Sequence, residues 1–123
     1  MIDYVCIGTR DLARANQFYD TAIRPLGYTC LSESADAPGY GRDKIALWIG
    51  RAARPVPADR DSNLHFCFAA PTREAVDALY AAALSAGGAD NGVPGVRPDY
   101  GAGYYAAFAV DPDGYRIEAY SGG

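Results

Sequence analysis

The two halves of this 123-residue chain repeat one another. When the first half is moved along by 61 positions, the matched pairs are Tyr4 and His65, Cys6 and Cys67, Tyr19 and Tyr80, Ala22 and Ala83, and Gly27 and Gly88. Chance would produce a few such matches, but both halves also share the order strand, helix and about three strands, which favours a true duplication. Neither βαβββ unit can cover its own sheet. The repeat therefore predicts an α+β fold in which two βαβββ units form a curved mixed sheet around a cleft.

The first half contains one clear helical pattern. Apolar side chains recur at helical spacing from Leu12 to Leu26. Asp11 is the predicted N-cap residue, and Gly27 is the predicted end of the helix. We predict strands at 2–7, 28–31 and 45–49, with turns and a short irregular strand between residues 34 and 42.

The second half repeats this order. Thr72 is the predicted cap of a helix that ends at Gly87 and Gly88. Residues 89–103 are rich in glycine and proline and are predicted to form a loop. Strands are predicted at 64–69, 104–110 and 115–120, with the turn sequence DPDG at 111–114 between the last two. We expect a single domain over 1–123, with a first unit at 1–50, a linker at 51–62 and a second unit at 63–123.

The composition excludes several classes of protein. The net charge is −4 and the pI is near 4.7, so the chain offers no basic stripe for nucleic acid. It has no apolar run of the roughly 20 residues that span a bilayer, and no charged-then-apolar leader. Its three cysteines show no CxxC spacing, which argues against a disulfide framework or a zinc ribbon. We therefore expect a cytoplasmic protein with reduced thiols.

Strand alternation groups the polar candidates on one face. Neighbouring side chains of a strand point to opposite faces, so Glu118 shares a face with Arg116 and Tyr120. By the same rule His65, the chain's only histidine, shares a face with Asn63 and Cys67. The purely apolar sets belong under the helices. His65 and Glu118 are therefore predicted to face one cleft.

Three segments carry a resemblance to a known family. They are IDYVCIGTRDLARANQFY near the start, NLHFCFAAPTREAVDALYAAAL in the second half, and YYAAFAVDPDGYRIEAY at the end. Together they resemble the vicinal oxygen chelate superfamily, which contains glyoxalases, bleomycin-resistance proteins and extradiol dioxygenases. The resemblance implies a homodimer and a cleft with a divalent metal, for which zinc, nickel, manganese and iron are the candidates. It places the four ligand positions at Tyr4, Trp48, His65 and Glu118.

Two of those four positions depart from the family pattern. Catalytic zinc sites usually keep three protein ligands, whereas here only His65 and Glu118 are ordinary ligand types. A free phenol ionises only near pH 10, so a weakly bound metal would not readily recruit Tyr4 as a phenolate, and the indole of Trp48 is not a ligand. Three hypotheses stay open at this point: a metal site completed by other groups, such as Cys6 and Cys67, metal-free ligand binding, or metal-free catalysis in which Glu118 raises the basicity of His65.

The segment VRPDYGAGYY at 96–105 supplies further candidates for ligand contact. Arg97 can clamp a carboxylate or phosphate, although a solvated arginine is the plainer interpretation. Tyr100 and Tyr105 can stack on an aromatic ligand, with Tyr104 as the alternative to Tyr105 because only one of the two can face the cleft. Trp48 would add an aromatic wall.

We therefore expect a small-molecule-binding protein with a degenerate metal site, in which the acidic charge favours a cationic ligand. The alternative is a metal-dependent, glyoxalase-like lyase or isomerase, or a dioxygenase, with His65 and Glu118 as catalytic residues and metal ligands.

Overall fold

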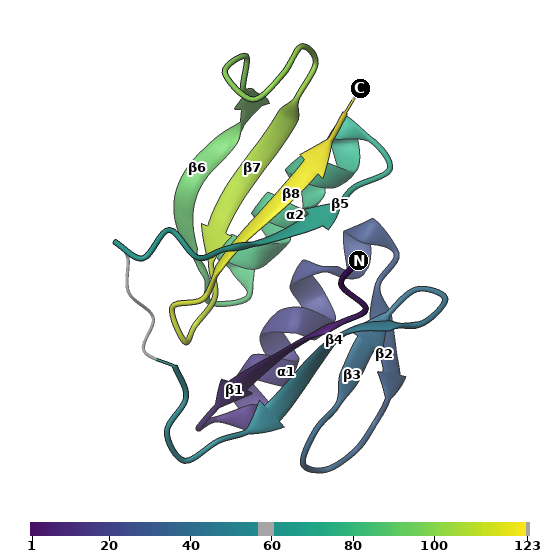
Figure 1. The fold of residues 1–123 in the computed structure, drawn as a ribbon, viewed down its shortest axis with the longest axis vertical. Coiled ribbons are helices and arrows are strands. Elements are labelled where there is room, and N and C mark those ends of the chain that lie inside the picture. The colour runs from purple at the N-terminus through teal and green to yellow at the C-terminus, as the bar shows by residue number, and fades with distance from the viewer. Residues whose placement is uncertain (57–60, 123) are drawn as a thin grey trace.

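The computed structural model describes residues 1–56 and 61–122, so residues 57–60 of the predicted linker lie outside the described part. The chain forms two four-stranded sheets, one from each half (Figure 1). In chain order the elements are β1 (Val5–Thr9), α1 (Leu12–Ala22), the 3₁₀ helix η1 (Arg24–Leu26), β2 (Thr29–Ser32), β3 (Gly39–Gly41), β4 (Ile45–Arg51), β5 (Phe66–Ala69), α2 (Arg73–Ser85), β6 (Ala89–Val96), β7 (Tyr105–Val110) and β8 (Arg116–Ser121). Within the described residues, no helix is long and apolar enough to cross a membrane.

Both sheets have the same topology. The strand order is β1-β4-β3-β2 in the first and β5-β8-β7-β6 in the second. In each sheet the first and last strands of the unit pair in parallel, and the remaining neighbours pair antiparallel. This identity of order confirms the predicted α+β fold of two βαβββ units.

One hydrophobic core joins the two halves. The buried residues of both helices and of the inner faces of both sheets form a single cluster. α1 and α2 also contact each other, and α2 crosses behind the second sheet (Figure 1). Gly88 allows a close approach here, because an added Cβ would lie 2.6 Å from the Val110 carbonyl oxygen and 2.8 Å from the Phe18 ring.

The predicted helix caps are confirmed. The Asp11 carboxylate accepts a hydrogen bond from the backbone N–H of Arg14 at 3.1 Å, and the Thr72 hydroxyl accepts one from that of Ala75 at 3.1 Å. The first helix is shorter than predicted. It ends at Ala22, and a 3₁₀ turn that contains Pro25 continues to Leu26, because proline has no N–H for the helical ladder.

The predicted loop at 89–103 is wrong over its first half, where β6 occupies Ala89–Val96. A strand survives here despite Pro94 because β6 is the outermost strand of its sheet and its register shifts around Gly92 and Gly95. Edge strands and bulges tolerate proline, since the missing N–H is not needed for a partner.

The DPDG turn at 111–114 connects the two halves. Asp111 is buried, and one of its carboxylate oxygens accepts a 2.6 Å hydrogen bond from the Tyr19 hydroxyl. Asp113 accepts hydrogen bonds from the Thr9 hydroxyl at 2.8 Å and from the Arg14 guanidinium at 2.6 Å. Each of these contacts joins the second unit to the first, so the turn fixes how the units sit on each other.

Candidate functional site

The second sheet has one face that turns away from α2, called the open face below. Ala107 and Ala109 of β7 belong to the core beside α2, so the alternate positions of that strand point the other way. The open face carries Ala106 and Phe108 from β7 and Arg116, Glu118 and Tyr120 from β8. Phe108 and Glu118 are direct cross-strand partners.

His65 and Glu118 meet on this open face, as strand alternation predicts. His65 Nε2 lies 3.0 Å from Glu118 Oε1. The glutamate is only 2% exposed, whereas the imidazole remains 37% exposed. The other ring nitrogen, Nδ1, lies 3.3 Å from the Asn63 carbonyl oxygen, so both ring nitrogens face hydrogen-bond acceptors. The pair is therefore an oriented imidazole backed by a buried carboxylate.

Tyr104 completes the surroundings of Glu118. Its hydroxyl donates a 2.6 Å hydrogen bond to Oε2, the carboxylate oxygen that His65 leaves free. Desolvation, together with the neighbouring Glu118 carboxylate, raises the pKa of the Tyr104 phenol well above its usual range. The Tyr104 ring stacks on Tyr120, with ring centroids 4.1 Å apart, and meets the edge of Tyr100 at 5.3 Å.

Tyr105 lies on the opposite face of the sheet, which corrects its predicted place in the cleft. Its hydroxyl donates a 2.6 Å hydrogen bond to Asp77 of α2, and the Arg73 guanidinium lies 5.1 Å from its ring centroid. The sequence allowed one of the two adjacent tyrosines to face the cleft. The register of β7 gives that place to Tyr104.

Arg97 lies over the open face. Its guanidinium carbon is 5.5 Å from the Phe108 ring centroid, and one of its nitrogens donates a 2.7 Å hydrogen bond to the Val93 carbonyl. Gly92 and Gly95 leave room for this side chain, because an added Cβ at either position would lie within 3.3 Å of the guanidinium. Arg97 is thus held by the chain's own backbone beside the site.

Tyr4 and Trp48 lie in the first unit, apart from this cluster. Tyr4 precedes β1 and is 53% exposed. Trp48 of β4 is half-buried, with its ring packed against Gly39, where an added Cβ would lie 2.8 Å away. Cys6 is the strand partner of Trp48. The structure therefore brings two of the four family ligand positions together on the second sheet and leaves the other two on the first.

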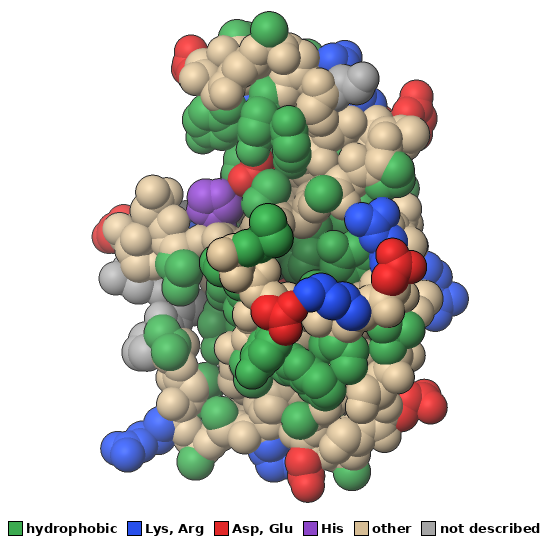
Figure 2. Space-filling model, turned by 45° about the vertical axis from the view of Figure 1, so that its right-hand side comes forward, with side chains coloured by type: hydrophobic (Ala, Val, Ile, Leu, Met, Phe, Trp, Pro, Cys, Tyr) green, Lys and Arg blue, Asp and Glu red, His purple; other side chains and the backbone are tan. Residues whose placement is uncertain are grey.

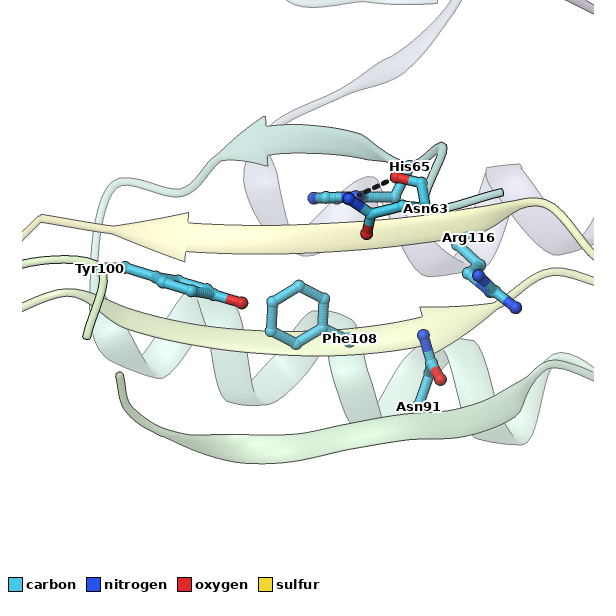
Figure 3. A pocket seen from close by; sticks show the side chains of 6 residues that line it. All are labelled: Asn63, His65, Asn91, Tyr100, Phe108 and Arg116. Carbon is cyan, nitrogen blue, oxygen red and sulfur yellow. Dashed lines mark hydrogen bonds between the residues drawn. The ribbon is translucent and has the colours of Figure 1, made fainter. Parts of the chain in front are cut away.

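A pocket of about 220 Å³ opens on the open face (Figure 3). Its lining residues all come from the second unit: Asn63, His65, Asn91, Tyr100, Phe108 and Arg116. Figure 3 shows Arg116 and Asn91 at one end, Tyr100 at the other, and Phe108 between them. Within the part of the chain that the structure describes, the lining contains Arg116 and no carboxylate, so this pocket does not favour the cationic ligand that the acidic net charge of the sequence indicated.

A second cavity, of about 330 Å³, lies where the two units meet. It is bounded by Ile2, Val5, Tyr28, Ala46 and Leu47 from the first unit and by residues 65–68 from the second. Figure 2 shows hydrophobic side chains gathered around a hollow near the middle of the molecule. His65 lines this cavity as well as the pocket on the open face.

The donor set does not fit a divalent metal. Among the described residues, no three His, Cys, Asp or Glu side chains converge on one point. Both carboxylate oxygens of Glu118 already accept hydrogen bonds from His65 and Tyr104. Desolvation, and after it the Glu118 carboxylate, raises the pKa of the Cys67 thiol to about 12, so without a metal this sulfur is a neutral thiol at pH 7.

This chain thus combines paired βαβββ units with helices on one face and the His65–Glu118 pair on the other. The model of the glyoxalase/bleomycin resistance protein/dioxygenase superfamily matches residues 1–119, and the chain belongs to this superfamily. No curated protein matches the chain.

Solved structures with the same fold cover nearly the whole chain. A glyoxalase/bleomycin resistance protein from Albidiferax ferrireducens T118 is 28% identical, with a TM-score of 0.81 over 97% of this chain and 96% of its own. A putative glyoxalase from Bacillus halodurans is 23% identical, with a TM-score of 0.73 over 98% and 95%. A fosfomycin resistance protein from Listeria monocytogenes is 12% identical, with a TM-score of 0.72 over 100% and 93%. The last two show the fold alone.

Proposed function

We propose that this chain binds a small organic ligand on the open face of the second sheet without a bound metal. The observation that carries the proposal is the state of Glu118, whose two oxygens are engaged by His65 and Tyr104 at 3.0 and 2.6 Å. A metal at this carboxylate would have to displace a short hydrogen bond from a buried acceptor. The displaced Tyr104 hydroxyl or His65 N–H would then need a new partner, so the internal network competes with the metal.

The surroundings of the pair suit an organic ligand. Phe108 contacts the His65 ring edge-on at 6.0 Å between centroids, and Tyr100 stands at the far end of the pocket. Aromatic side chains offer large, flat contact areas, and tyrosine adds a hydrogen-bonding tip. The role that we assign to Glu118 is to hold His65 in one orientation, so that its ring forms a fixed wall of the pocket.

We also propose that the chain works as a cytoplasmic homodimer. The pocket on the open face is bounded only by the second unit, so one side of it is free to be covered. The first unit of a second copy, with Tyr4 and Trp48, is the surface that we assign to that side. This arrangement would give the ligand an aromatic wall on each side.

The alternative function is a metal-dependent, glyoxalase-like lyase or isomerase, or a dioxygenase. The observation in its favour is the 3.0 Å approach of His65 to Glu118 on one face. These two residues would hold the ion, and a bound divalent metal would supply Lewis-acid polarisation of a substrate oxygen. At least one more ligand would have to come from another copy of the chain, and Tyr104 would have to release Glu118.

Metal titration separates the two functions. Chelator-stripped, untagged protein is titrated calorimetrically with zinc, nickel, manganese and ferrous ions, beside the Glu118→Ala and Tyr104→Phe variants. The proposal expects no micromolar binding to the native chain. Near-stoichiometric metal that is lost in Glu118→Ala and kept in Tyr104→Phe would overturn it in favour of the metal-dependent enzyme.

A further inference from the structure

The charges on the open face differ from those of the chain as a whole. The chain carries a net charge of −4, yet the carboxylate of this face, on Glu118, is 2% exposed and hydrogen-bonded at both oxygens. Two guanidinium groups lie on the same face, with Arg97 over the Phe108 ring and Arg116 in the pocket lining. A ligand that enters the pocket therefore meets positive charge before it meets the buried glutamate.

The guanidinium of Arg116 is the charged group of the open face that is available to a ligand. Arg116 stands two residues before Glu118 on β8, so the two side chains share a face. Within the described part of the chain its side chain has no hydrogen bond, ion pair or ring contact, whereas the Arg97 side chain donates a hydrogen bond to the Val93 carbonyl. An arginine fork with free donors is suited to planar oxyanions, above all carboxylates.

The other lining residues are arranged around this fork. Asn91 rises from β6 towards Arg116, and its amide adds a donor at the same end of the pocket (Figure 3). Phe108 occupies the middle, where a ring can lie against it, and the Tyr100 hydroxyl points back towards Phe108 from the far end (Figure 3). The order along the pocket is therefore a cation, an aromatic surface and a hydrogen-bonding hydroxyl.

We propose that the pocket takes a small aromatic carboxylate. Its carboxylate is held by Arg116 and Asn91, its ring lies against Phe108 beside the His65 imidazole, and a polar substituent at the other end of the ring meets Tyr100. This inference rests on the proposed ligand-binding function of the open face and names the class of ligand for that same site. It replaces the cationic ligand that the net charge of the sequence favoured.

Benzoate, benzamide and benzylamine test the charge preference, because they present an anionic, a neutral and a cationic group on the same ring. Each is titrated into the full chain while the backbone amide resonances of the pocket residues are followed by NMR. We expect benzoate to bind about tenfold more tightly than benzamide, the scale of one charge-assisted hydrogen-bond pair, and benzylamine to bind most weakly. Benzoate binding should weaken as salt is added.

Arg116→Gln and Arg24→Gln form the variant and its control. Arg116→Gln keeps a polar side chain on a half-exposed strand position, and matching thermal melts verify its fold. It should lose about tenfold in affinity for benzoate and leave that for benzamide unchanged. Arg24, an exposed arginine of η1 on the first unit, should have no effect on either ligand.

The outcomes separate this inference from the proposed function. If benzamide or benzylamine shifts the pocket resonances at least as strongly as benzoate, or if Arg116→Gln leaves benzoate binding intact, the carboxylate assignment fails while ligand binding on the open face stands. If none of the three compounds shifts the pocket resonances, both proposals are overturned.

Discussion

The hydroxyl of Tyr104 donates a 2.6 Å hydrogen bond to Oε2 of Glu118, across fourteen residues of chain. The other oxygen of the same carboxylate lies 3.0 Å from His65 Nε2. A glutamate at the position that the superfamily resemblance assigns to a metal ligand is therefore already satisfied by two side chains of its own unit. Tyr104 is the residue that distinguishes this site from one in which His65 and Glu118 are both available to bind a metal.

Tyr104→Phe tests that distinction. The substitution removes one donor from a buried carboxylate, so we expect the free energy of unfolding to fall by about 1.5 to 3 kcal/mol. It also frees one carboxylate oxygen, so zinc should bind the variant more tightly than the native chain. Urea unfolding and calorimetric zinc titration measure the two effects on the same samples.

The neighbouring tyrosine supplies the control. Tyr105→Phe removes a hydrogen bond of equal length, 2.6 Å, but to the exposed carboxylate of Asp77 on the other face of the sheet. We expect a loss of less than about 1 kcal/mol and no change in zinc binding. Equal effects of the two substitutions on zinc binding would contradict the role given to Tyr104.

The sequence predicted the meeting of His65 and Glu118 because strand alternation is a strict geometric rule. It did not settle which of Tyr104 and Tyr105 joins them, since neighbouring tyrosines are equivalent until the register of β7 is known. It also favoured a cationic ligand, because net charge is summed over the chain. The pocket instead exposes Arg116 and covers the carboxylate of Glu118.

Cys67 should react slowly with thiol reagents despite its place on the open face. Desolvation and the Glu118 charge raise its pKa to about 12, so little thiolate exists at pH 8. We expect iodoacetamide to modify Cys67 about 100-fold more slowly in the native chain than in urea, as measured by peptide mass spectrometry.

The Glu118→Gln variant measures how much the charge of Glu118 contributes to the raised pKa of Cys67. With the carboxylate charge removed, the pKa of Cys67 should fall and its labelling at pH 8 should accelerate. Cys30, whose raised pKa owes nothing to Glu118, is the internal reference and should keep its rate. A native Cys67 that labels as fast as in urea would refute the prediction.

The Tyr19–Asp111 hydrogen bond should make the stability of the protein sensitive to alkaline pH. Burial, followed by the charge of Asp111, raises the pKa of Tyr19 well above 10 in the native state. Between about pH 10 and that higher pKa the unfolded chain loses the Tyr19 proton while the native chain keeps it. The stabilisation is therefore full below about pH 10 and declines as the pH rises above it.

Tyr19→Phe removes both the hydrogen bond and this proton. At pH 7 the variant should be less stable by about 2 to 3 kcal/mol, because a buried carboxylate loses its donor. The difference in stability between the two proteins should narrow above pH 10, since only the unsubstituted protein carries the Tyr19 hydroxyl that titrates. Urea midpoints at pH 7, 9 and 10.5 measure the trend. A difference that stays constant over that range would show that Tyr19 does not titrate as described.

The fold was predicted more completely than the site, because several of its features depend only on residues that are neighbours in the sequence. Asp11 and Thr72 are cap residues whose hydrogen bonds involve only their own helices, so sequence was sufficient to find them. β6 was missed because Pro94 and the two glycines of the segment, Gly92 and Gly95, argue against a strand when they are considered alone. The strand forms because β7 supplies a pairing edge, which is a tertiary effect.

Trp48, the only tryptophan, tests the proposed homodimer. Within one chain it lies on the first sheet, away from the pocket that Arg116 lines on the second. If a second copy places its first unit over that pocket, benzoate should change the Trp48 emission where the protein is dimeric and leave it unchanged after dilution to monomer. Analytical ultracentrifugation fixes the two concentrations, and the Arg116→Gln dimer should need about tenfold more benzoate for the same change. A dimer in which benzoate binds with no change in Trp48 emission would place the interface elsewhere on the chain.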